Sequence, residues 1–175
     1  IGSNMLSNCI LLRTIALYPA VPPTLGEKAL PPPKKGLTIY VQDTYYEAYT
    51  NAWPEYKGVI KGVRLGSKEL PWKVGDDETD TVAAFTNEKG RLEIIGVGDM
   101  QDFTEQDPAP WASDALTEVV VGAGVTEIGA NAFAGCTGLK TLVVSAAVLP
   151  TGLNQGGNDL AGVKIFVPAD TADAY

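Results

Sequence analysis

The feature that most constrains this chain is an internal repeat, because two stretches far apart in the sequence carry the same pattern. Residues 1–9 match residues 128–136 at an offset of 127. The matched pairs include Ile1/Ile128, Gly2/Gly129, Asn4/Asn131 and Cys9/Cys136. With one change of offset the match runs on, so that 1–49 and 128–175 are two copies of one unit. Such self-similarity is typical of repeat architectures, in which each unit packs against its neighbours.

Each copy also contains a shorter period of 23 or 24 residues. Leu116, Val119 and Val121 recur 23 residues later as Leu139, Leu142 and Val144. This is the L-x-x-L-x-L pattern of a leucine-rich repeat. Its alternation predicts a short strand with one apolar side facing inward, and strands at a fixed interval stack as rungs of a solenoid. We expect two rungs in the first copy and three in the second, at Ile15–Leu17, Ile39–Val41, Val119–Val121, Leu142–Val144 and Ile165–Val167.

The second half of each repeat is expected to hold a short strand near Val125, a glycine turn and a brief helical turn. Phe133 and Leu6 are expected to fill the interior. Cys9 and Cys136 occupy equivalent positions in separate copies. We therefore expect both thiols to be buried in their own repeat core and free, the alternatives being a disulfide or a reactive thiol.

A terminal cap is expected after the last strand of the first copy. Asp43 is a plausible N-cap and Pro54 a stop signal, which predicts a helix over 44–53. Its inner face would carry Tyr45, Tyr49 and Trp53, or Tyr46 and Tyr49. The second copy begins the same element at Asp170 and stops at Tyr175. Solenoids need such an element over their exposed core.

Residues 61–111 differ in kind from the repeats. Alternating runs predict strands at Leu70–Val74, Thr81–Phe85 and Leu92–Ile95, with a hairpin turn over 87–90. The expected fold is a leucine-rich repeat solenoid, mostly strand and loop, in two short arrays with a β-rich connecting segment. The expected domains are 1–60, ending in the helical cap, and 61–175, in which a leading segment (61–115) precedes the second array (116–175).

The repeat resembles the BspA-type leucine-rich repeat of bacterial surface proteins. The resemblance rests on the pattern from Val125 through Ala132-Phe133 to Cys136 and Val144, on the leading run 90–111, and on the array ending from Pro22 to Trp53. It covers about 1–60 and 88–175, and Met5-Leu6 and Gln42 depart from the usual residues. It implies a non-catalytic recognition or adhesion module, outside the cell or attached to its surface or outer membrane. The implied partner is a protein or glycan on a host or neighbouring cell.

Composition excludes several other classes. The chain has no histidine, which removes histidine triads, histidine metal sites and imidazole acid–base pairs. Its net charge of −8 disfavours nucleic acid and anionic membranes. It has no apolar run long enough to span a membrane. It opens with Ile1 rather than Met and shows no signal peptide, so we expect a fragment or a processed product.

Few residues suggest site chemistry, and no cofactor or metal is expected. The acidic run Asp76–Asp80 could bind calcium, but it lacks EF-hand spacing and is better interpreted as a solvated turn. Trp53, Trp72 and Trp111 could stack on sugars, although tryptophans at repeat ends more often fill core. Three functions stay open: a binding module, a structural spacer within a larger surface protein, and a hydrolase using carboxylates of 61–111.

The candidate binding face follows from strand alternation. If the rung residues point inward, Val120, Val143 and Phe166 point outward, again 23 residues apart, and the first copy supplies Ala16 and Tyr40. An outward column is normally polar, whereas this one is apolar, as a partner-binding surface would be. The alternative is that another part of the same chain, 61–111 above all, lies over it.

Overall fold

We describe a computed structural model of the 175-residue chain, covering residues 1–34, 36–87 and 89–169. The chain is mostly β, with a β-solenoid of about seven turns and little helix. It divides into two compact units, unit 1 (Ile1–Leu70) and unit 2 (Pro71–Tyr175), each of which is described by itself. Among the described residues no helix has the length and apolar character needed to cross a bilayer.

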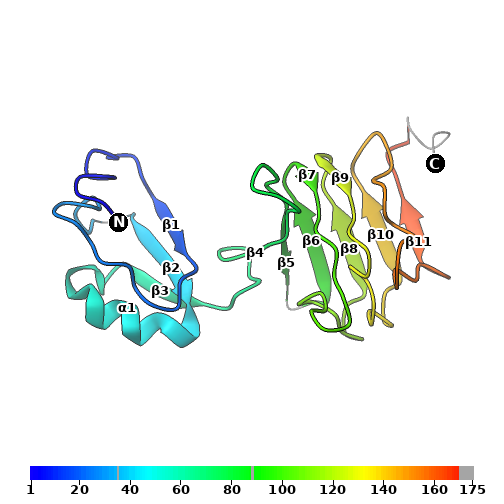
Figure 1. Ribbon diagram of the computed structural model, residues 1–175, viewed down its shortest axis with the longest axis horizontal. Helices are drawn as coiled ribbons and strands as arrows, with labels where there is room; N and C mark the ends of the chain where they lie inside the picture. Colours follow the sequence, from blue (N-terminus) through cyan, green and yellow to red (C-terminus); the bar gives the residue numbers. More distant parts are fainter. Residues whose placement is uncertain (35, 88, 170–175) are drawn as a thin grey trace. The chain divides into compact units, whose positions relative to one another are not determined.

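Unit 1 is built on a parallel sheet in the order β1-β2-β3 (Figure 1). Its strands are β1 (Thr14–Leu17), β2 (Thr38–Gln42) and β3 (Ile60–Val63). Ile15, Ile39 and Ile60 lie side by side in register, which confirms the two rungs expected here and adds a third. The third rung was missed because glycine occupies its second inward position. A Cβ at Gly62 would lie 3.1 Å from Asp43 Cα and 3.3 Å from Tyr46 Cβ, so a larger residue fits only if these neighbours move by a few tenths of an ångström.

The expected helix is present in unit 1. A 3₁₀ turn η1 (Asp43–Tyr45) leads into α1 (Tyr46–Ala52), and a second 3₁₀ turn η2 (Pro54–Tyr56) follows. Asp43 Oδ1 accepts a hydrogen bond from the next residue's N–H at 2.8 Å, rather than capping α1 itself. Tyr49 and Trp53 are buried and meet edge to face with their ring centroids 5.2 Å apart. These two rings pack in the same core as the inward residues of β2.

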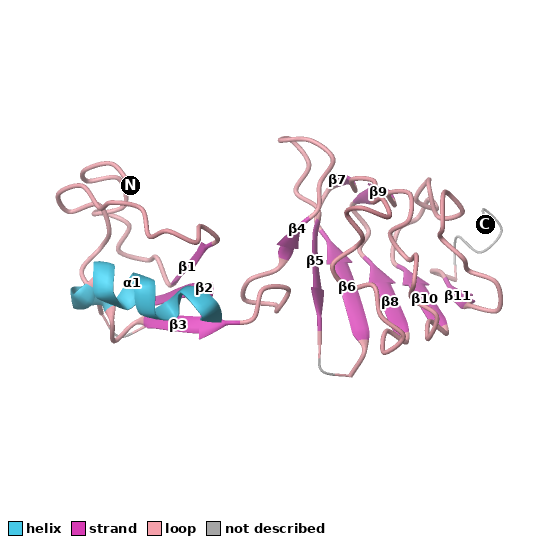
Figure 2. Cartoon of the chain, turned by 60° about the horizontal axis from the view of Figure 1, so that its bottom comes forward, coloured by secondary structure: helices cyan, strands magenta, loops and turns pink. Residues whose placement is uncertain are grey.

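Unit 2 is built on a second sheet, in the order β11-β10-β8-β6-β5-β4 (Figures 1 and 2). Its strands are β4 (Trp72–Lys73), β5 (Ala83–Thr86), β6 (Arg91–Ile95), β8 (Glu118–Val121), β10 (Thr141–Val144) and β11 (Lys164–Phe166). Strands β6, β8, β10 and β11 pair in parallel, while β4 and β5 are antiparallel additions. The strand expected at Leu92–Ile95 is therefore also a rung, in register with the second array.

The rungs of unit 2 share a closely packed inner column. Leu92, Val119 and Leu142 are in register and fully buried. Two residues further along each strand, the next inward-facing position is occupied by Ile94, Val121 and Val144. Ile165 continues the register but is 47% exposed, because β11 is the edge strand of its sheet. Strand β11 ends at Phe166, so Val167, the last residue of the expected rung, lies just beyond the strand.

The second half of the repeat forms the opposite wall of unit 2. Strand β9 (Val125–Glu127) pairs in parallel with β7 (Gly98–Asp99), as expected for a short second strand. Phe133 is buried, and Trp111 donates its Nε1–H to Ala132 O at 2.8 Å. Gly129 is required here, because a Cβ at this position would lie 1.8 Å from Gln101 O of the preceding turn.

The cysteine expectation is half wrong. Both cysteines are free, and Cys136 is buried, which raises the pKa of its thiol by desolvation. Cys9, however, is exposed. Cys136 lies against the preceding turn, where Ser113 hydrogen-bonds to it through its backbone. In the described part of unit 1, the neighbouring residues Ile10 and Leu11 are exposed as well, so this loop lacks the cover that its counterpart has. The cap expected from Asp170 to Tyr175 lies outside the described residues.

Candidate functional site

The outward side of the unit 2 sheet carries the predicted apolar row. Val120 pairs with Val143, and Val143 with Phe166, so the three side chains lie in one row across β8, β10 and β11. Val120 and Val143 are half-buried between their neighbours, and Phe166 is 54% exposed. We call this row, together with the outward residues beside it on β6, β8, β10 and β11, the sheet face.

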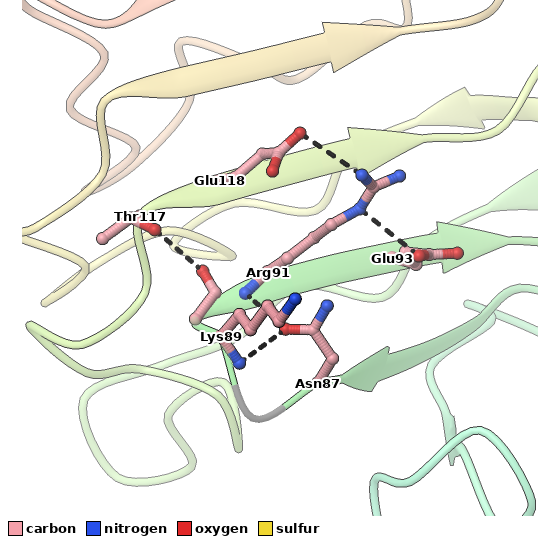
Figure 3. Close-up of polar contacts among 7 residues, drawn as sticks. Asn87, Lys89, Arg91, Glu93, Thr117 and Glu118 are labelled. Atoms are coloured by element: carbon pink, nitrogen blue, oxygen red, sulfur yellow. Dashed lines mark hydrogen bonds and ion pairs between the residues drawn. The ribbon is translucent and has the colours of Figure 1, made fainter.

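A charged cluster borders the apolar row. Glu93 is the register neighbour of Val120, and Arg91 is that of Glu118. Arg91 Nε lies 3.3 Å from Glu93 Oε1, and Arg91 Nη1 lies 3.5 Å from Glu118 Oε1 (Figure 3). The Nε contact is an ion pair without hydrogen-bond geometry. All three side chains are more than a third exposed, so these pairs add little to stability and chiefly orient charge on the surface.

Sequence reasoning missed these charged residues. Arg91 and Glu93 alternate with the buried Leu92 and Ile94, a pattern that would have placed them outward had β6 been recognised as a rung. Asn87 fixes the turn that leads into β6, because its Oδ1 accepts the N–H groups of Lys89 at 2.9 Å and Arg91 at 3.1 Å (Figure 3). The sheet face thus has an apolar end and a charged end.

Within the segment 61–111, the strands β4, β5 and β6 extend the sheet of unit 2 beside β8 instead of lying over the apolar row. Strand β6 pairs with β8 edge to edge, and β5 pairs with β6. On the outward side of β5, Phe85 lies opposite Glu93 and is only 8% exposed. The outward side of the sheet is therefore covered at Phe85 on β5, next to the sheet face, while Phe166 on β11 is accessible.

The two candidate residues of the first copy form a row of their own. Ala16, Tyr40 and Lys61 are register neighbours on the sheet of unit 1. Ala16 is exposed and Tyr40 is half-buried. This row offers less apolar surface than the row of unit 2, because its three side chains end in a methyl group, a phenol and an ammonium group.

The acidic run forms a hydrogen-bonded turn. Asp77 Oδ1 accepts the N–H and the hydroxyl of Thr79, both at 2.6 Å, and Asp80 Oδ1 accepts the N–H of Asp99 at 3.1 Å. The hydroxyl bond, followed by the backbone bond, lowers the pKa of Asp77. Within the described residues no three acidic or cysteine side chains gather as metal ligands would. The interpretation as a turn accounts for these carboxylates better than a calcium loop does.

Neither the tryptophans nor the surface hollow of unit 1 offers a stronger candidate site than the sheet face. Trp53 and Trp111 are buried, and Trp72 packs against the core of unit 2, as residues that fill core would. Unit 1 has a hollow of about 540 Å³ bordered by Asn8, Lys28 and Tyr56, among others. The Tyr56 hydroxyl is already used, since it donates to Pro31 O at 3.2 Å.

Comparison with known proteins does not identify the chain: no family model matches it, and neither the curated proteins nor the solved structures contain a significant match. The argument about function therefore rests on the fold and on the sheet face.

Proposed function

We propose that this chain is a non-enzymatic recognition module of the leucine-rich repeat type, related to BspA-like surface proteins, which binds through the sheet face of unit 2. The proposed partner is a protein or glycan on a host or neighbouring cell, and the proposed location is the cell surface. The observation that carries the proposal is the outward apolar row Val120–Val143–Phe166, which ends in an aromatic ring that is more than half exposed.

The chemistry of the sheet face supports a partner whose surface is partly apolar and partly charged. An exposed ring beside aliphatic side chains gains free energy when a flat apolar surface or a sugar ring covers it. The neighbouring Arg91, Glu93 and Glu118 supply oriented charge that would select among such partners. A spacer would have no use for an apolar row in this position.

The test is a binding array of glycans and extracellular matrix proteins, probed with the full chain and with Val143→Lys. Binding that is lost in Val143→Lys, but kept in the control Val97→Lys, is the expected result. Val97 is a suitable control because it is 66% exposed and lies on a turn outside the sheet face. If nothing on the array binds, the spacer function is favoured. If both variants bind as the parent does, the chain binds through a surface other than the sheet face, and the proposed recognition surface is wrong.

A further inference from the structure

Unit 1 contains a hollow that the proposed function does not use. Its volume is about 540 Å³, and three separate segments of unit 1 supply its walls: 4–8, 28–32 and the 3₁₀ turn η2. The residues that matter to its chemistry are Asn4, Ser7, Asn8, Lys28, Leu30 and Tyr56. We call this space the unit 1 hollow. Because segments from later in unit 1 form two of its walls, it lies within the unit.

In the second copy of the repeat, side chains tie the corresponding turns together. Asn131 Oδ1 accepts the N–H of Gly157 at 2.6 Å. The buried Asn158 makes hydrogen bonds to three backbone groups. Depending on where the repeat changes its offset, the counterpart of Asn158 in unit 1 is Pro31 or Pro32. Proline has no polar side-chain atom, so the described residues of unit 1 cannot form this network, and a hollow lies between the turns instead.

The unit 1 hollow combines an apolar floor with a polar rim. Leu30 and Tyr56 are buried and form the floor, and the Tyr56 hydroxyl is engaged by Pro31 O at 3.2 Å, which leaves the ring as its contribution. Asn4 and Asn8 on the rim are exposed, and each amide offers both donors and an acceptor. A few polar groups around an apolar floor, in a volume between about 300 and 1,000 Å³, are typical of a site for a small molecule.

Lys28 supplies the charged group of the hollow, and its backbone is strained. Its φ is 51°, in the left-handed region that residues with a side chain rarely adopt. In unit 2, the turn after Thr151 also has left-handed residues, but these are the glycines Gly152 and Gly156. The Lys28 ammonium group lies 3.8 Å from Glu27 Oε1, and because both side chains are exposed this pair contributes little. Strain of this kind gathers at ligand sites, which suggests that the ammonium group has another partner.

The charges of unit 1 favour an anionic ligand. Residues 1–70 contain 8 Lys and Arg and 5 Asp and Glu, a net charge of +3, although the whole chain carries −8. Among the described residues that line the hollow, Lys28 is the one that carries a charge. A single ammonium group pairs with a single carboxylate, whereas the amides of Asn4 and Asn8 match hydroxyl groups, which also both donate and accept. A sugar ring with one carboxylate has all of these groups.

We propose that the unit 1 hollow binds an acidic sugar, which is a monosaccharide unit with one carboxylate, such as a hexuronate. The carboxylate pairs with Lys28, and the hydroxyl groups bond to the amides of Asn4 and Asn8. The apolar face of the sugar ring lies against Leu30 and Tyr56. This site belongs to unit 1 and goes beyond the function proposed for the sheet face of unit 2, so neither depends on the other.

The first test is a titration of the isotope-labelled full chain with sodium glucuronate, monitored through its amide resonances. Glucose at matched ionic strength is the neutral probe. Glucuronate at up to about 50 mM is expected to shift the amides of 4–8 and 28–30 in a saturable way, with about five-fold higher affinity than glucose, the factor that an exposed ion pair contributes. No saturable shift at these amides, or equal affinity for glucose, overturns the proposal. Shifts confined to β8 and β10 also overturn it and assign the sugar to the sheet face.

Charge variants locate the carboxylate. Lys28→Gln should reduce the affinity for glucuronate to that for glucose. Lys68→Gln removes the same charge from an exposed lysine of unit 1 that does not line the hollow, and it should have no effect. Glu27→Gln should raise the affinity, because the carboxylate that competes for Lys28 is removed. If Lys68→Gln weakens binding as much as Lys28→Gln does, the attraction is general to unit 1 and there is no site at Lys28.

Lys28→Asn separates binding from folding. Asparagine tolerates the left-handed conformation and glutamine does not, while both remove the charge. The Asn variant should therefore melt at a higher temperature than Lys28→Gln and show the same loss of preference for glucuronate. If the two variants melt alike, Lys28 is not strained and the argument that gives it a ligand fails.

An amidated and acetylated glutamate is the last probe, since it carries a carboxylate without a sugar ring. It should bind more weakly than glucuronate. If it binds equally well, the hollow takes acidic peptides, and the assignment to a sugar is wrong.

Discussion

The substitution Val143→Lys tests whether the sheet face is open, and Val144→Lys is its matched control one residue away. Val144 points inward and is 1% exposed, in register with Val121. A lysine there buries an unpaired ammonium group and loses a packed valine, which costs at least about 3 kcal/mol of unfolding free energy. Val143 points outward between Val120 and Phe166. A lysine there loses cross-strand contacts of about 0.5–1 kcal/mol and extends its amine into water.

The measurement is a urea titration of the full chain, in which unfolding is monitored through the amide resonances of β8 and β10. These resonances report on unit 2 alone. The linear extrapolation gives the free energy of unfolding of each variant. The expected order is parent, then Val143→Lys slightly lower, then Val144→Lys far lower. If Val143→Lys costs as much as Val144→Lys, Val143 is covered in solution. The open-face argument, and the proposed function built on it, would then be wrong.

Three further predictions concern the repeat itself. Gly129→Ala should destabilise unit 2 by about 1–3 kcal/mol, since its Cβ would strike Gln101 O, whereas Gly2→Ala should be nearly neutral, as chemical denaturation of both variants will show. Cys9 should react rapidly with a thiol reagent, and Cys136, whose pKa is raised by burial, only after denaturant is added; equal rates in native protein would contradict the burial of Cys136. The folded-state pKa of Asp77 is lowered by its bonds from Thr79, so the stabilisation it provides is complete above its unfolded-state pKa and is lost as pH falls through the folded value. An NMR titration should show Asp77 below its ordinary value in the parent and closer to it in Thr79→Ala, and a normal value in the parent would contradict the turn geometry.

The sequence alone was enough to predict most of the rungs. The 23-residue spacing of Val119 and Leu142, with alternation on either side, places both side chains inward regardless of their surroundings, because a one-residue slip would expose every apolar residue of the strand. The equivalence of the two copies extends to the backbone. Asn4 and Asn131 both adopt a left-handed conformation, with φ of 59° and 58°.

Rungs that depart from the pattern could not be predicted in the same way. Strand β3 has Gly62 at an inward position, where Asp43 and Tyr46 approach it closely. A glycine does not contribute to an apolar periodicity, so the sequence pattern does not mark this strand as a rung. Strand β6 precedes β8 at a different spacing from the others, and only its pairing with β8 shows that it is a rung. The charged cluster of Arg91, Glu93 and Glu118 depends on that pairing, so it was invisible until the two strands were placed side by side.

Burial at the ends of the solenoid was decided by tertiary structure alone. Cys9 and Cys136 occupy the same place in the repeat, yet one is exposed and the other buried. Ile165 has the inward position of Leu142 but is 47% exposed. The repeat determines which way a side chain points, because that depends on the local backbone. Whether the side chain is covered depends on the adjacent turn, since each turn of a solenoid completes its core only against its neighbours.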